Sequence, residues 1–97
     1  MNIGIIGSGF TGSMHADLYA KITGAVLKGI TSKTNVSALE AAQKHAVFCY
    51  PNYKEMLDDD SLDVIDICTP TVTHASIAAE CMRRGKHVIL EFPAVSN

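Results

Sequence analysis

Three glycines near the start of the chain, Gly7, Gly9 and Gly12, follow the spacing G-x-G-x-x-G. Each glycine of this pattern has its own role in a turn that holds a dinucleotide. Gly7 permits a tight turn, Gly9 leaves room for a pyrophosphate at the backbone, and Gly12 lets a helix lie close to a strand. The spacing therefore predicts dinucleotide binding, and a tight turn without a ligand is the alternative.

The sequence on either side of the glycines supplies the context that this motif requires. Residues 2–6 predict a short buried strand, and residues 13–22 predict a helix. Four apolar side chains recur at helical spacing: Phe10, Met14, Leu18 and Ile22. The free N–H groups and the positive dipole end of such a helix attract phosphate. We therefore expect Phe10 and Thr11 to lie beside the ligand with the glycines.

Strands and helices alternate along the rest of the chain. The further strands expected are residues 25–31, 47–50, 62–68 and 87–92. The further helices expected are residues 36–45, 53–57 and 72–84. The side chains expected to face the sheet from these helices are Ala38, Ala41, Ala42, Ile77, Ala78 and Cys81. This alternation predicts one α/β domain over residues 1–97, with a doubly wound, Rossmann-like parallel sheet and helices on both faces. The expected strand order is 3-2-1-4-5.

In such a sheet, ligands bind at the carboxyl ends of the strands where the strand order reverses, here between the first and fourth strands. This rule places four segments along one edge: residues 7–12, 32–33, 69–74 and 91. The second segment bears on the choice of cofactor. An NAD site has an acidic residue about 20 residues after the glycines, where it holds the ribose 2′-hydroxyl. Ser32 occupies that place.

A neutral or basic turn suits a 2′-phosphate, which an acidic residue would repel. Ser32 and Thr34 can donate hydrogen bonds to that phosphate, and Lys33 adds a positive charge. The turn therefore favours NADP over NAD, although a neutral turn also tolerates NAD.

Composition excludes several classes of partner. The formal net charge of −2 shows no basic surplus, so neither nucleic acid nor an anionic membrane is indicated. No apolar run approaches the length of a membrane span, and we expect a cytoplasmic protein without a signal peptide. Cys49, Cys68 and Cys81 show neither C-x-x-C spacing nor neighbouring histidines. They are expected to be reduced thiols rather than a disulfide or a metal site.

Three segments resemble the Gfo/Idh/MocA oxidoreductase family in order and spacing. They are residues 3–15 (IGIIGSGFTGSMH), 63–74 (DVIDICTPTVTH) and 85–93 (GKHVILEFP). The resemblance covers nearly the whole chain but only the N-terminal domain of that family. It implies an NAD- or NADP-dependent dehydrogenase or reductase that acts on sugars, inositols or related polyols. In the family, a second domain, absent from this chain, supplies the substrate pocket.

The resemblance also implies roles for individual residues. Thr69, Pro70 and His74 fall on a family segment that lies along the cofactor, and Thr71 stands where many members have Asn. Ser32-Lys33 looks like the Ser-Arg pair of NADP-preferring members. The cofactor-binding residues expected are Gly7, Gly9, Phe10, Thr11, Gly12, Ser32, Lys33, Thr34, Thr69, Pro70, Thr71, His74 and Glu91.

One departure from the family removes a catalytic group. Phe92 stands where the family has the lysine that assists proton transfer, and a phenyl ring cannot act as an acid or base. His74 is the remaining candidate, because an imidazole titrates near neutral pH, although a structural hydrogen bond at the start of a helix is an alternative role. No catalytic residue is therefore assigned.

Three further polar side chains invite a functional interpretation. We expect His15 to pack against a neighbouring loop, Tyr19 to be half-buried on its helix, and Asp66 to be paired or exposed at an edge. A catalytic role is less favoured for each of them, because sequence alone shows no partner.

The function expected is the cofactor-binding part of an oxidoreductase that is inactive without a second domain. The alternatives are a nucleotide-binding or redox-sensing module without catalysis, a subunit completed by a partner, and a domain that binds nothing. The last expected strand carries the apolar residues Val88, Ile89, Leu90 and Phe92. An open sheet edge there leads us to expect self-association.

Overall fold

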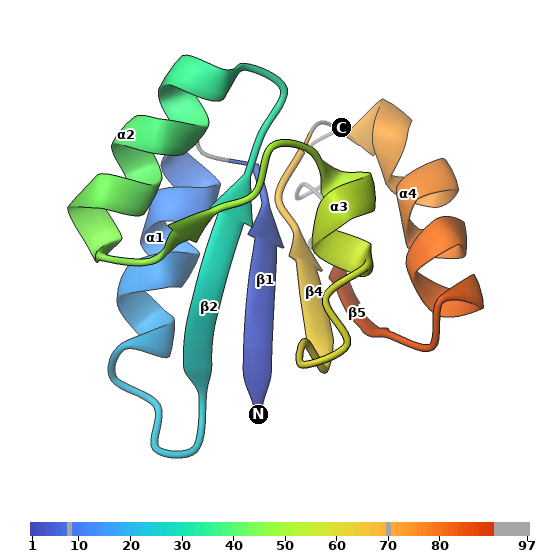
Figure 1. Cartoon of the computed structure of the whole chain (residues 1–97), viewed down its shortest axis with the longest axis horizontal. Helices are drawn as coiled ribbons and strands as arrows, with labels where there is room; N and C mark the ends of the chain where they lie inside the picture. Colours follow the sequence, from blue (N-terminus) through green and yellow to red (C-terminus); the bar gives the residue numbers. More distant parts are fainter. Residues whose placement is uncertain (8, 70, 91–97) are drawn as a thin grey trace, which may run out of the picture.

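Strand β1 (Asn2–Ile6) lies at the centre of a five-stranded parallel sheet (Figure 1). The structure is a computed structural model that describes residues 1–7, 9–69 and 71–90. The strand order is β3-β2-β1-β4-β5, as the sequence predicts. Parallel pairing of β1 with β2 on one side and β4 on the other creates the reversal of strand order beside β1.

The elements follow the predicted alternation, with small differences at their ends. The other strands are β2 (Val26–Thr31), β3 (Phe48–Cys49), β4 (Val64–Ile67) and β5 (His87–Leu90). The helices are α1 (Phe10–Tyr19), α2 (Asn35–His45), α3 (Tyr53–Leu57) and α4 (Thr71–Arg83). Among the described residues, no helix is both long and apolar enough to span a membrane.

Helix α1 differs most from its prediction. It begins at Phe10 rather than at residue 13, so that Gly12 lies inside the helix. Two members of its apolar repeat also face solvent, since Met14 and Leu18 are 41% and 50% exposed. Ala16, only 2% exposed, packs against the sheet instead. A face of small residues lets the helix lie closer to the strands than a face of large apolar side chains would.

Two clusters of apolar side chains form the core, one on each face of the sheet. The cluster on the α1–α2 face contains Ile5, Ala16, Ile30 and Ala41. The cluster on the α3–α4 face contains Ile6, Tyr50, Met56, Leu57, Leu62, Ile65, Ile67, Ile77, Ala78 and Cys81. The predicted inward faces of α2 and α4 are confirmed, since all six of their predicted sheet-facing residues are buried. Because neighbouring residues of a strand face opposite sides, Ile5 and Ile6 contribute to different clusters.

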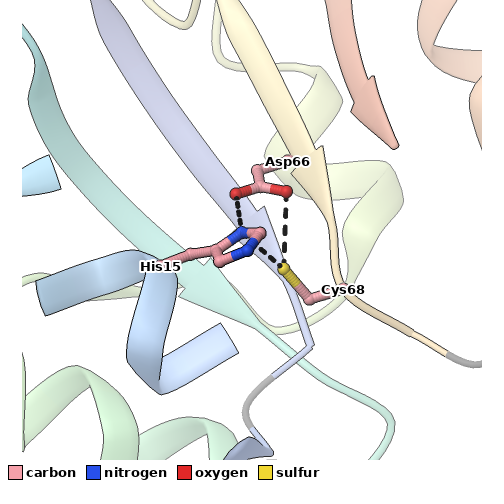
Figure 2. A group of neighbouring side chains, drawn as sticks. All are labelled: His15, Asp66 and Cys68. Atoms are coloured by element: carbon pink, nitrogen blue, oxygen red, sulfur yellow. Dashed lines mark hydrogen bonds and ion pairs between the residues drawn. The ribbon is translucent and has the colours of Figure 1, made fainter. Parts of the chain in front are cut away.

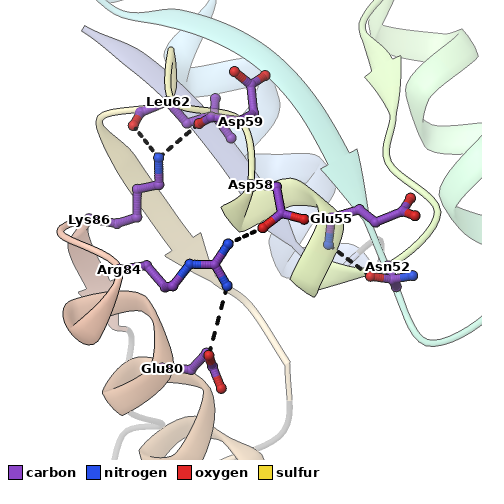
Figure 3. A network of polar contacts seen from close by, with 8 residues as sticks. All are labelled: Asn52, Glu55, Asp58, Asp59, Leu62, Glu80, Arg84 and Lys86. Carbon is purple, nitrogen blue, oxygen red and sulfur yellow. Dashed lines mark hydrogen bonds and ion pairs between the residues drawn. The ribbon is translucent and has the colours of Figure 1, made fainter.

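A buried lysine joins the loop before β4 to the loop before β5 (Figure 3). Lys86 is 8% exposed, and its Nζ donates to the carbonyl oxygens of Asp59 at 2.8 Å and Leu62 at 3.0 Å. Nearby, Arg84 donates to Asp58. These contacts fix the turn that leads into β4, and β4 carries residues of the site described below.

Replacing Lys86 by methionine should lower the free energy of unfolding by about 1–3 kcal/mol. The buried Leu62 carbonyl oxygen loses the ammonium donor, and the part-buried Asp59 carbonyl oxygen keeps only the Leu62 N–H. Urea denaturation followed by circular dichroism measures this loss. Lys54→Met, on the exposed surface of α3, is the control and should change stability by less than about 0.5 kcal/mol. Equal stability of the two variants would show that water replaces the Lys86 ammonium without cost.

Candidate functional site

The turn after β1 has the geometry that its first glycine predicts. Gly7 has φ +118°, and its N–H donates to the Thr31 carbonyl at 2.7 Å. A Cβ at this position would lie 2.9 Å from the Cys68 backbone. Both the left-handed backbone and the close approach of Cys68 therefore require glycine here. The turn is consequently held between the ends of β2 and β4.

The other two glycines have opposite surroundings. Gly12 lies against the turn, where an added Cβ would be 2.3 Å from the Gly7 carbonyl oxygen. Gly9 is the N-cap of α1 with an extended backbone, and a Cβ there would meet no described atom within 4 Å. Gly12 thus serves close packing of helix on strand, whereas Gly9 borders open space at the positive end of the helix.

A cavity of about 700 Å³ opens at the carboxyl ends of β1, β2 and β4. It is lined by Ile6, Gly7, Gly9, Thr31, Ser32, Lys33, Thr34, Ser37, Pro51, Asn52, Tyr53, Cys68, Thr69 and Ile77. Six of the predicted cofactor-binding residues are therefore brought together: Gly7, Gly9, Ser32, Lys33, Thr34 and Thr69. This is the edge of the sheet where the topology predicts a ligand.

The remaining predicted residues fall into three groups. Gly12 and Thr11 lie in α1 and are not among the described residues that line the cavity. The backbones of Phe10, Thr71 and His74 lie in the first turns of α1 and α4, but their side chains are outside the described part of the structure. Pro70, Glu91 and Phe92 lie outside the described residues altogether, so their roles stay predictions.

Hydroxyl groups line the cavity beyond β2. Ser32 Oγ donates to the Thr34 carbonyl at 2.8 Å and lies 3.1 Å from Ser37 Oγ. Ser37 Oγ is also 2.6 Å from Thr34 Oγ1. Ser37 was not among the predicted site residues, although its position three residues after the N-cap Thr34 is a signal for such a contact. The three hydroxyls form a compact polar group at the start of α2.

One buried polar atom at the cavity lacks a partner. Thr31 is 1% exposed, and its Oγ1 makes no hydrogen bond with any residue that the structure describes. A buried hydroxyl without a partner is costly, so a ligand or water at the cavity would stabilise it. Thr31, at the end of β2, was not among the predicted site residues, which in this segment were Ser32, Lys33 and Thr34.

These surroundings fit a dinucleotide. Gly9 leaves room for a diphosphate beside the first turn of α1. The cluster of three hydroxyls from Ser32, Thr34 and Ser37 can form hydrogen bonds with an adenosine ribose. No acidic side chain occurs among the described residues that line the cavity, and Lys33 contributes a positive charge. The site is therefore suited to an anionic ligand.

Beneath α1, a polar cluster lies against the same cavity (Figure 2). Asp66, 0% exposed, receives hydrogen bonds from Tyr19 Oη and His15 Nδ1, each at 2.6 Å. Cys68, which lines the cavity, lies with Sγ 3.4 Å from both His15 Nδ1 and Asp66 Oδ1. Asp66 is thus paired, as expected, whereas His15 contacts β4 rather than only a loop. Burial, and then the hydrogen bond to Asp66, raises the pKa of Tyr19 far above its usual value, so the phenol stays a donor.

Comparison with known proteins supports the interpretation of the cavity. The family model GFO_IDH_MocA, described as an oxidoreductase family with an NAD-binding Rossmann fold, matches residues 1–97. The chain is 37% identical to 4-carboxy-2-hydroxymuconate-6-semialdehyde dehydrogenase of Sphingobium sp. over 100% of its own length and 31% of that protein. It is 32% identical to myo-inositol 2-dehydrogenase of Thermotoga maritima over 100% of its own length and 29% of that protein. It therefore spans less than a third of either relative.

Solved structures show the same fold. GenD2 from gentamicin A biosynthesis, in complex with NAD, superposes with a TM-score of 0.91 at 25% identity, over 98% of this chain and 27% of that one. A probable dehydrogenase from Thermotoga maritima superposes with a TM-score of 0.90 at 31% identity, over 96% of this chain and 28% of that one. In each case the matched part is a fraction of a longer protein.

Proposed function

The chain belongs to the Gfo/Idh/MocA oxidoreductase family and carries its NAD-binding Rossmann domain, and on this premise we propose that it is the cofactor-binding part of a nicotinamide-dependent dehydrogenase or reductase. The observation that carries the proposal is the open space at Gly9, which lines the cavity of about 700 Å³. The cofactor would supply hydride transfer. The substrate proposed is a sugar or polyol, because one relative is a myo-inositol 2-dehydrogenase, and a second domain would have to complete its binding site.

Different residues of the cavity would bind different parts of the dinucleotide. The backbone of Gly7 and Gly9 and the N-terminus of α1 would bind the diphosphate. Ser32 and Thr34 would donate hydrogen bonds at the adenosine ribose, and Lys33 would pair with a 2′-phosphate. We propose Thr69 for the nicotinamide side, together with Thr71, His74, Pro70 and Glu91. Phe92 carries no transferable proton, so proton transfer falls to His74 or to residues of a second domain.

Calorimetric titration with NADPH and with NADH tests the proposal. We expect both to bind with one site per chain, and NADPH to bind more tightly because Lys33 attracts the extra phosphate. Absence of heat from both at millimolar concentration would overturn dinucleotide binding. A preference for NADH would overturn only the assignment of Ser32, Lys33 and Thr34 to a 2′-phosphate.

Replacing Lys33 by glutamate should weaken NADPH binding about tenfold and leave NADH binding nearly unchanged. The variant removes one attraction and adds one repulsion, each of about 0.5–1 kcal/mol at an exposed site. The matched control is Lys21→Glu, an equal charge change at an exposed position after α1. The ratio of the two dissociation constants is the measured quantity, and an equal loss for both cofactors would contradict the role of Lys33.

Self-association forms the last part of the proposal. Within the described sheet, β5 pairs only with β4, and Ile89 on it is 40% exposed. An apolar edge strand is a template for pairing with a second chain. We expect a dimer or larger species by light scattering after size exclusion, shifted towards monomer by Ile89→Lys. A monodisperse monomer of the unaltered chain would contradict this expectation.

A further inference from the structure

Three side chains with metal-ligating atoms converge beneath α1: His15, Asp66 and Cys68 (Figure 2). An imidazole nitrogen, a carboxylate oxygen and a sulfur lie within 4.8 Å of one another. None of these residues belongs to the set assigned above to dinucleotide binding, although Cys68 lines the cavity. The cluster therefore needs an explanation of its own.

The sheet register brings these atoms together. Asp66 and Cys68 are two residues apart at the end of β4, so their side chains point to the same side of the sheet. Asp66 pairs with Ile5, whose side chain belongs to the core on the α1–α2 face. His15 enters from α1, 51 residues away in sequence from Asp66. Sequence spacing alone consequently shows no metal motif.

The separations approach those of a tetrahedral zinc site. Zinc lies about 2.0–2.2 Å from nitrogen or oxygen ligands and about 2.3 Å from sulfur, which implies roughly 3.3–3.6 Å between ligand atoms. The two separations from Cys68 Sγ, to His15 Nδ1 and to Asp66 Oδ1, are both 3.4 Å. The third contact uses the other carboxylate oxygen, since His15 Nδ1 lies 2.6 Å from Asp66 Oδ2. When a metal replaces the proton between them, this distance must lengthen by less than about 1 Å, and the carboxylate must rotate so that one oxygen faces the metal together with the nitrogen and the sulfur.

Charge and donor type also favour zinc. With Asp66 and Cys68 ionised, two negative charges balance one Zn²⁺ in a site where Asp66 is 0% exposed. A thiolate and an imidazole suit zinc, whereas magnesium and calcium prefer oxygen ligands throughout. Tyr19 Oη, 2.6 Å from Asp66 Oδ2, is placed to orient the carboxylate from outside the coordination sphere.

We propose that His15, Asp66 and Cys68 bind Zn²⁺, with the fourth coordination position open to water in the cavity that Cys68 lines. Three protein ligands with one open position are the usual arrangement of an accessible zinc site. The ion would join α1 to the end of β4, beside the Gly7 turn.

Titration of the reduced protein with Co²⁺, followed by absorption spectroscopy, tests the proposal. Cobalt replaces zinc in such sites and gives a sulfur-to-cobalt charge-transfer absorption only when a thiolate is a ligand. We expect this absorption at one equivalent per chain, its disappearance on addition of Zn²⁺, and its loss in Cys68→Ser. The matched control is Cys49→Ser, another half-buried cysteine that forms no disulfide, which should retain it. Tyr19→Phe should weaken Zn²⁺ binding about tenfold.

A second measurement uses the unaltered chain and does not depend on a variant that folds. Zn²⁺ should protect Cys68 from alkylation by iodoacetamide, as read by mass spectrometry, and should leave Cys49 unprotected. The proposal is overturned if the unaltered chain gives no charge-transfer absorption, if a folded Cys68→Ser variant retains it, or if Zn²⁺ leaves Cys68 alkylation unchanged. None of these outcomes requires a nicotinamide cofactor.

Discussion

Replacing Gly9 by valine should abolish dinucleotide binding and leave the domain folded. The backbone at Gly9 has φ −75° and ψ −160°, an extended conformation that valine adopts readily. An added Cβ meets no described atom within 4 Å, so the protein itself has room for the side chain. That room is the space proposed for the diphosphate, which the valine methyl groups would fill.

Two measurements separate binding from folding in this variant. Calorimetric titration should show at least a hundredfold loss of NADPH affinity, about 2.7 kcal/mol. Urea denaturation should show a stability change of only about 1 kcal/mol, because valine is a poorer N-cap than glycine. Ala20→Val, at the exposed C-cap of α1 where φ is −62°, tests whether any added valine disturbs binding and should leave affinity unchanged. Retained affinity in the Gly9 variant would place the diphosphate elsewhere.

Replacing Gly12 by alanine should have the opposite effect and destabilise the fold itself. The new methyl group would lie 2.3 Å from the Gly7 carbonyl oxygen and 3.0 Å from the Gly7 carbonyl carbon. Both are backbone atoms of the turn, so relief requires α1 to move away from β1. Alanine in a helix would otherwise stabilise by about 1 kcal/mol relative to glycine, and overpacking of this kind costs about 1–3 kcal/mol or more.

We therefore expect Gly12→Ala to lower the free energy of unfolding by about 2 kcal/mol, a large share of the stability of a small domain. Thermal and urea denaturation both measure this loss. Gly9→Ala is the matched control, with the same added atom in open space, and should differ from the unaltered chain by less than about 1 kcal/mol. If the two alanine variants prove equally stable, the close contact between α1 and the turn is not what requires glycine at residue 12.

The order of elements, the parallel sheet and the edge of the sheet at which the cavity opens could all be predicted from the amino-acid sequence. These features depend on local patterns: short apolar runs, helical spacing, and glycines placed directly after a strand. These patterns predicted the strand order. They also predicted that six residues would meet at one edge, where they line the cavity: Gly7, Gly9, Ser32, Lys33, Thr34 and Thr69. The start of α1 was not, because the glycine pattern alone does not show where the turn ends and the helix begins.

The packing of the whole chain determines which face of α1 is buried and which side chains meet beneath it. Apolar periodicity favoured burial of the face with Met14 and Leu18. In the structure, Gly12 and Ala16 face the sheet instead, because small residues permit a shorter distance between helix and sheet. Long-range pairing then brings His15 to Asp66 across 51 residues and places Cys68 beside both. Such contacts depend on register and helix rotation, which are properties of the packed chain and leave no local pattern in the sequence.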